Sequence, residues 1–148
     1  MAVSYEPDIE RRLRAVPARN ELARILKLRA VSDAVKAGWT QRKIADEIGV
    51  EQPEVSRLAK AARLTPGVCE RSPREVLLEY ATGMIDHAAM MNELEHWDYT
   101  FGQTDPTGDV YLPGTWDQIE RAGDLLSDDD YQRLFNLTAD RRAAAGRV

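Results

Sequence analysis

Apolar residues recur every three or four positions through the first part of the chain, which is the spacing of one face of an α-helix. They predict a short first helix that stops near Pro17, because a proline inside a helix lacks a donor N–H and clashes with the preceding turn. A second, longer helix should end at Gly38. Two further short helices are expected over residues 41–48 and 52–63.

Residues 66–73 hold two prolines and one glycine, a composition that favours a linker. We therefore expect one domain over residues 1–65, a linker over 66–73, a second domain over 74–140 and a frayed tail at 141–148.

The second domain should begin with a helix, because Ser72, Pro73 and Glu75 form a capping box with proline in the first turn. The apolar pattern extends this helix to about Trp97. Two β-prone runs around a Pro/Gly turn, residues 99–102 and 110–112, then predict a small hairpin.

Two more helices should complete the second domain. Thr115 with Gln118 is a capping-box candidate for a helix that reaches Leu125. Ser127 is expected to cap a last helix, whose first turn carries three aspartates where the helix dipole favours negative charge. The fold class is thus mainly α, an N-terminal helical domain plus a small, mostly helical C-terminal domain with a short β-hairpin. Five aromatic residues are expected to form the core around that hairpin: Trp97, Tyr99, Phe101, Tyr111 and Trp116.

The formal net charge of −5 changes meaning when it is divided between the two halves. Residues 1–71 contain 14 Lys/Arg and 10 Asp/Glu, a balance of +4, whereas residues 72–148 contain 6 and 15, a balance of −9. The overall charge argues against nucleic acid as a partner, since such domains are usually basic, but the first half does not.

Several function classes are excluded by what the sequence lacks. A single cysteine, Cys69, cannot form an internal disulfide, and with only His87 and His96 beside it a zinc site is implausible. The sequence contains no Ser-His-Asp arrangement, Walker loop, GxGxxG or paired catalytic carboxylates, so we expect no enzyme and no cofactor. It also has neither a signal peptide nor an apolar run of about 20 residues, so we expect a cytoplasmic protein without a membrane partner.

The stretch 41–58 carries the most specific chemistry. Two short helices joined by a three-residue turn pack at a steep angle, so a small Ala45 is needed at the closest approach and Gly49 at the turn. The exposed face of the second helix has no apolar residue larger than proline and fits the DNA major groove, about 12 Å wide. The expected motif core consists of Ile44, Ala45, Ile48, Gly49, Val50, Val55 and Leu58.

This stretch resembles the helix-turn-helix of bacterial and phage repressors. The repressor pattern has Gln first, Ala fifth, Gly ninth, aliphatic residues at set positions and often Val-Ser in the second helix. Pro53, near the start of the second helix, departs from it but is tolerated in a first turn. The matching residues are Gln41, Ile44, Ala45, Ile48, Gly49, Val50, Val55, Ser56 and Leu58.

The resemblance implies a DNA interface on both helices. It implies that base edges face Gln52, Glu54, Ser56, Arg57 and Lys60. It implies that phosphates contact Thr40, Gln41, Arg42 and Lys43. Glu51 and Glu54 have two interpretations, helix caps or readers of cytosine, and we favour caps.

Two functions follow as hypotheses. The first is a cytoplasmic, nucleoid-associated transcriptional repressor that reads double-stranded DNA and whose acidic domain over residues 74–140 serves oligomerisation. It would bind as a homodimer or, alternatively, as a monomer helped by N-terminal arginines (Arg11, Arg12, Arg14 and Arg19). The second comes from the layout, which is similar to antitoxins of bacterial toxin–antitoxin pairs. In that case residues 74–140 would neutralise a basic protein partner, and DNA binding would be autoregulation.

Overall fold

The structure is a computed structural model that describes residues 6–146. This part of the chain is mainly helical, with eight helices and one two-stranded antiparallel sheet. The chain divides after Arg71 into two compact units, called unit 1 and unit 2 below. Within the described residues, none of the helices combines the length and apolar composition that crossing a lipid bilayer requires.

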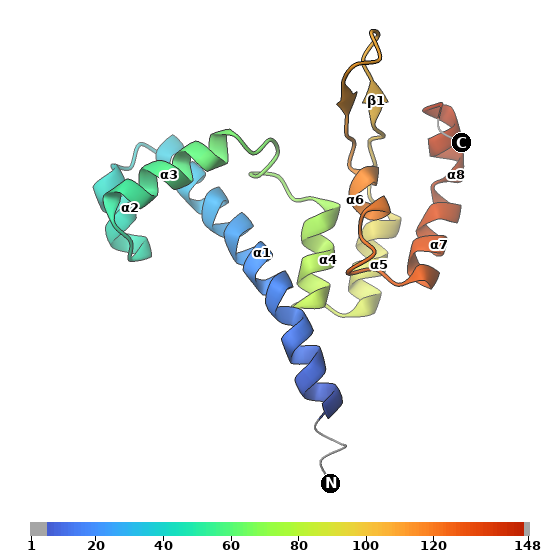
Figure 1. Cartoon of the computed structure of the whole chain (residues 1–148), viewed down its shortest axis with the longest axis horizontal. Helices are drawn as coiled ribbons and strands as arrows, with labels where there is room; N and C mark the ends of the chain where they lie inside the picture. Colours follow the sequence, from blue (N-terminus) through green and yellow to red (C-terminus); the bar gives the residue numbers. More distant parts are fainter. Residues whose placement is uncertain (1–5, 147–148) are drawn as a thin grey trace. The chain divides into compact units, whose positions relative to one another are not determined.

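Unit 1 contains α1 (Glu6–Lys36), α2 (Gln41–Ile48) and α3 (Gln52–Arg63). Figure 1 shows α2 and α3 at the C-terminal end of α1, whose N-terminal part extends away from both. The three helices share one core, which includes Leu28, Val31, Ile44, Ala45, Val55, Leu58, Ala59 and Ala62.

α1 is one continuous helix of 31 residues with Pro17 inside it, so the expected stop near Pro17 is wrong. The missing N–H leaves the carbonyl of Leu13 without its helical donor. Leu13 is 65% exposed, so water can bond that carbonyl, and the flanking Arg, Leu and Ala residues are strong helix formers.

Residues 66–71, which their composition predicts to be a linker, are hydrogen-bonded to α1. The Arg29 guanidinium donates through Nε to the Val68 carbonyl at 3.0 Å and through Nη2 to the Glu70 carbonyl at 3.2 Å. The rest of the predicted linker belongs to the start of α4 (Pro73–Ala81), where Ser72 Oγ accepts from the Glu75 N–H at 3.2 Å as expected.

The single helix predicted from Ser72 to Trp97 is wrong, because the chain forms two helices there, α4 and α5 (His87–Glu95). Gly83 takes φ +81° and ends α4, with the Met84 N–H bonded back to the Glu79 carbonyl at 2.9 Å. Asp86 then caps α5 by accepting from the Ala89 N–H at 2.8 Å. Both signals are local and override the apolar periodicity.

The predicted hairpin is present, but its first strand lies later in the chain. β1 (Gln103–Thr104) pairs antiparallel with β2 (Tyr111–Leu112), in the register Gln103 with Leu112. Residues 99–102 are not a strand. Tyr99 is buried in this segment, and its hydroxyl donates to the Leu94 carbonyl at 2.6 Å. Burial raises the pKa of the Tyr99 phenol well above its usual value.

The hairpin turn is organised by Asp105. Its carboxylate accepts from the Asp109 N–H at 2.9 Å, the Val110 N–H at 3.2 Å and the Thr107 hydroxyl at 2.9 Å. The bond from the Val110 backbone is the largest cause of the lowered pKa of Asp105, followed by the Thr107 hydroxyl.

α6 (Trp116–Glu120) is shorter than predicted, and Thr115 makes no side-chain capping bond within the described residues, so that capping box is wrong. The Thr115 Oγ1 instead accepts from the Thr100 N–H at 2.9 Å. Gln118 Oε1, the other half of the expected box, accepts from the Arg74 N–H at 2.8 Å. Both side chains are therefore used to join segments distant in sequence.

α7 (Asp128–Leu137) begins where predicted, with Ser127 Oγ accepting from the Asp130 N–H at 3.2 Å. The expected frayed tail 141–148 is wrong for its first residues, because α8 (Ala139–Ala144) continues the fold. Arg142 is only 6% exposed; its guanidinium lies 3.5 Å from the Phe135 ring centre and donates to the Phe135 carbonyl at 2.8 Å. Residues 147 and 148 lie outside the described residues.

Unit 2 has its own core around Trp116, which is fully buried and makes an edge contact with Tyr99 at 5.1 Å. Phe101 and Trp97 pack partly against this core, as predicted for the aromatic cluster. Tyr111 does not, because it is 43% exposed and donates to the buried carboxylate of Asp117 at 3.0 Å. The members of the core include Val76, Leu77, Met90, Met91, Leu94, Ile119, Ala122, Leu126 and Leu134.

Polar side chains also hold unit 2 together. Asp117 is buried and accepts from the Gly114 N–H at 2.9 Å as well as from the Tyr111 hydroxyl. Arg74 donates to both carboxylate oxygens of Asp124 at 3.2 Å, which lowers the pKa of that carboxyl. The pair of Arg74 with Asp124 joins segments far apart in sequence, but the Asp124 side chain is 60% exposed, so the pair adds little stability beyond that of the apolar core.

Gly114 offers a stability test, because a Cβ there would lie 2.4 Å from the Thr100 carbonyl oxygen and 2.6 Å from the Phe101 carbonyl carbon. Both are backbone atoms and cannot rotate away. We expect Gly114→Ala to destabilise unit 2 by about 1–3 kcal/mol, the usual cost of overpacking. Urea unfolding followed by circular dichroism measures this. Gly123→Ala is the control, since a Cβ there would have no described atom within 4 Å apart from those of its two chain neighbours. Equal effects of the two substitutions would contradict the packing argument.

Candidate nucleic-acid interface

The turn between α2 and α3 depends on the backbone conformation of Gly49. Gly49 ends α2 with φ +74° and ψ +36°, in the left-handed region. Its N–H donates to the Ala45 carbonyl at 2.9 Å, and the N–H of Val50 donates to the same carbonyl at 3.1 Å. The chain therefore reverses within residues 49–51, and α3 begins at Gln52.

Most of the predicted motif core is buried between the three helices of unit 1. The exposed fractions are 2% for Ile44, 4% for Ala45, 0% for Val55 and 3% for Leu58. Val50 packs partly against the same core. Ala45 is buried in the core that α2 and α3 share, where a small side chain was predicted.

Ile48 is the exception, because it is 38% exposed. The prediction that it fills the angle between α2 and α3 is wrong. Ile48 is the last residue of α2, so no further turn of that helix covers its side chain.

α3 has a buried face and an open face. The buried face packs into the core of unit 1 and consists of Val55, Leu58, Ala59 and Ala62. The open face consists of the exposed residues Gln52, Pro53, Ser56, Arg57, Lys60 and Arg63. Four of the five predicted base-reading residues therefore lie on the open face. The fifth, Glu54, is half-buried.

Arg63 is an exposed residue of this face that was not among the predicted base readers. It follows Lys60 by three positions and Ser56 by seven, so helical spacing alone places it on the same face. The open face of α3 therefore carries three cationic side chains, Arg57, Lys60 and Arg63.

Arg57 is engaged by a neighbour on its own helix. Its Nε and Nη2 lie 3.0 Å and 2.8 Å from Glu54 Oε2, and the Arg57 side chain is 70% exposed. An exposed pair three residues apart contributes only about 0.2–0.5 kcal/mol, so a stronger acceptor can displace the carboxylate.

The favoured interpretation of Glu51 and Glu54 as helix caps is wrong. Glu51 occupies the N-cap position of α3, but within the described residues its side chain makes no capping bond. Good capping side chains are short, and glutamate is not among them. Glu54 pairs with Arg57 instead.

The N-terminus of α2 presents a second set of polar groups, since Thr40, Gln41, Arg42 and Lys43 are all exposed. Thr40 Oγ1 caps the helix by accepting from the Lys43 N–H at 3.2 Å, which leaves its O–H free to donate. The Lys43 ammonium lies 3.8 Å from the ring centre of Trp39, a side chain 40% exposed. Trp39 thus holds the Lys43 side chain at the start of α2, a contact that the sequence did not predict.

Both surfaces expose hydrogen-bond donors: guanidinium, ammonium, amide and hydroxyl groups. These are the groups that bind phosphate oxygens and the edges of bases.

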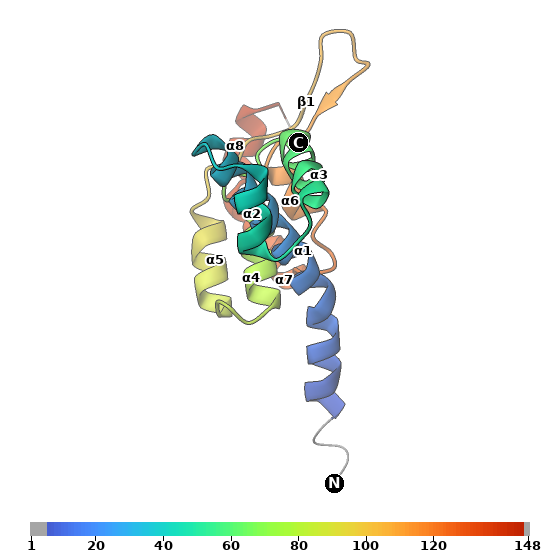
Figure 2. The ribbon, with the colours of Figure 1, turned by 90° about the vertical axis from the view of Figure 1, so that its left-hand side faces the viewer.

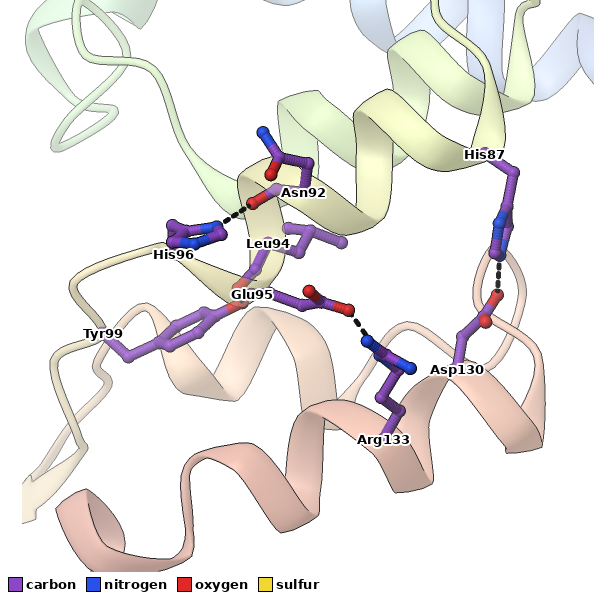
Figure 3. Close-up of polar contacts among 8 residues, drawn as sticks. All are labelled: His87, Asn92, Leu94, Glu95, His96, Tyr99, Asp130 and Arg133. Atoms are coloured by element: carbon purple, nitrogen blue, oxygen red, sulfur yellow. Dashed lines mark hydrogen bonds and ion pairs between the residues drawn. The ribbon is translucent and has the colours of Figure 1, made fainter.

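The titratable side chains of unit 2 make separate local contacts. His87 Nε2 lies 2.9 Å from Asp130 Oδ2, which joins α5 to α7, and His96 Nδ1 lies 2.7 Å from the Asn92 carbonyl oxygen (Figure 3). In the described part of the chain, no three His, Cys, Asp or Glu side chains gather closely enough to hold a metal ion.

No protein-family model, no curated protein and no solved structure matches this chain.

Gly49 gives a direct test of the turn. We expect Gly49→Ala to destabilise unit 1 by about 1–2 kcal/mol, because an L-residue is strained in the left-handed region. Gly49→Asn should cost less, since asparagine enters that region more readily. Thermal unfolding followed by circular dichroism measures both. Equal destabilisation by Ala and Asn would show that the backbone conformation is not the cause.

Proposed function

We propose that this protein represses transcription by binding a specific sequence of double-stranded DNA through α2 and α3, as helix-turn-helix repressors do. The observation that carries the proposal is the division of α3 into a buried apolar face and an exposed face of donors. A helix of 12 residues is about 18 Å long and fits a major groove about 12 Å wide. Such a function places the protein in the cytoplasm, at the nucleoid.

In this proposal α2 positions the protein on the backbone. Thr40, Gln41, Arg42 and Lys43 donate to phosphate oxygens, which sets the register of α3 without reading sequence. The contact between Lys43 and Trp39 reduces the freedom that the lysine loses on binding.

α3 then reads base edges with Gln52, Ser56, Arg57 and Lys60. Arg57 leaves Glu54 for guanine O6 and N7, because a bidentate pair of that kind discriminates by about 1–3 kcal/mol and exceeds the exposed ion pair. Glu54, once released, can accept from a cytosine amino group. In this proposal Glu54 is available to a base only after Arg57 has left it.

Arg57→Ala tests base reading. A preferred duplex is first selected from a randomised library with the unaltered protein, and binding is measured by fluorescence anisotropy. We expect a loss of about 1–3 kcal/mol on the selected duplex and relaxed preference at one base pair. Arg121→Ala, at an exposed arginine of unit 2, is the control and should bind normally. Equal losses on selected and random duplexes would contradict base reading by Arg57.

Lys43→Gln tests phosphate contact. We expect weaker binding to every duplex and a salt slope smaller by about one, because each phosphate contact releases close to one counterion. Anisotropy titrations at several salt concentrations measure the slope. Lys43→Arg keeps the charge and should keep the slope; an unchanged slope in Lys43→Gln would remove Lys43 from the interface.

A second candidate function is that of an antitoxin, and the charge of unit 2 favours it. From Glu75 to Asp130 the chain has 14 acidic residues and one basic residue, Arg121. Such a surface is repelled by phosphates and suits a basic protein. Co-expression with the genes that flank this one tests it: a basic protein that co-purifies stoichiometrically with unit 2 supports the antitoxin, and its absence leaves the repressor.

A further inference from the structure

Arg57 differs from the other two cations on the open face of α3 in having an acidic partner. Its Nε and Nη2 lie 3.0 Å and 2.8 Å from Oε2 of Glu54. Lys60 and Arg63, in the last turn of the helix, make no ion pair within the described residues. The one cation of this face that is ion-paired is therefore the arginine proposed to read guanine.

Glu51 and Glu54 both lie at the start of α3, but their side chains differ in what they contact. Glu51 is exposed, and in the described part of the chain its side chain makes neither a hydrogen bond nor an ion pair. The Glu54 side chain is 39% exposed and pairs with Arg57. Figures 1 and 2 both show the N-terminal part of α1 extending away from α2 and α3, so the arginines of that part do not compete for Glu54.

The ion pair limits what Arg57 gains on DNA of an incorrect sequence. A phosphate offers Arg57 the same kind of contact that it already makes with a carboxylate, so the exchange gains little. The released carboxylate of Glu54 would also lie beside phosphates, which repel it. On random DNA, Arg57 would therefore stay on Glu54, and its charge would add little to the non-specific attraction.

A guanine changes this balance. Its O6 and N7 together accept two hydrogen bonds from one guanidinium, and the amino group of a cytosine can donate to the released carboxylate. Both halves of the ion pair then have a partner on the DNA. Opening the pair is therefore offset at a guanine and not at a phosphate.

We propose that Glu54 is a specificity-determining residue of α3, which withholds Arg57 from phosphates and releases it to guanine. The inference rests on the proposed function, because it concerns the same interface. It gives Glu54 an effect on sequences that the protein should not bind, which base reading does not include. The modest balance of +4 on residues 1–71 agrees with it, since a masked charge lowers binding to every duplex without the guanine.

Glu54→Gln tests the inference, because it removes the partner of Arg57. Anisotropy titrations at several salt concentrations compare the selected duplex with a random one. We expect the affinity for the random duplex to rise about two- to fivefold, the range that an exposed ion pair represents. Its salt slope should increase by about one, because Arg57 then contacts a phosphate. The affinity for the selected duplex should change by less than about twofold, since the glutamine carbonyl still accepts from cytosine.

Glu51→Gln is the matched control, since it removes the same charge from the same end of α3 without freeing an arginine. It should leave the salt slope unchanged, and Glu54→Gln should do the same in an Arg57→Ala background. Equal effects of Glu51→Gln and Glu54→Gln would make charge alone the cause and overturn the inference. A weakened selected complex with unaltered random binding would also overturn it, because Glu54 would then hold Arg57 in place for guanine. Circular dichroism confirms that each variant is folded.

The inference and the proposed function fail in different ways. An unaltered protein that prefers no duplex over random DNA removes the proposed function, and the inference with it. An unaltered protein that prefers the selected duplex, while its Glu54→Gln variant binds random DNA as before, keeps the proposed function and removes the role of Glu54.

Discussion

The packing of α3 on the last turns of α1 is the contact on which the exposed surface of unit 1 depends. Val55 and Leu58 are buried against Leu28 and Val31, and this burial fixes the rotation of α3 about its own axis. Because side chains on a helix point in fixed directions, fixing the buried face also fixes which residues are exposed. The direction of the hydrogen-bond donors on α3 is therefore set by buried apolar side chains that would not touch a ligand. The chain reversal at Gly49 sets the position at which α3 starts.

Helix ends were predicted correctly wherever a local capping residue or glycine determined them. Thr40 and Gly49 bound α2 as expected, and Ser72 and Ser127 cap the helices that they were expected to begin. The predictions were wrong where a local signal competed with context. At Pro17 the local penalty was outweighed by the surrounding helix.

The remaining differences have the same physical origin. The apolar periodicity across residues 73–97 predicted one helix, although Gly83 ends α4 and Asp86 caps α5 within that range. Threonine is a common helix cap, but Thr115 bonds to Thr100 instead. Sequence spacing rules do not predict a contact between residues this far apart. In the candidate site, the pairing of Glu54 with Arg57 is within reach of the helical spacing rule, whereas the contact of Lys43 with Trp39 depends on the turn geometry between α1 and α2.

The charge of the chain bears on how tightly the proposed interface binds DNA. A balance of +4 on residues 1–71 gives only a modest attraction to DNA, and the −9 of the second half opposes it. One α3 that reads a few base edges would then bind weakly, since little non-specific affinity adds to it. Low charge therefore favours specificity over affinity, because a larger positive balance would raise binding to every sequence alike.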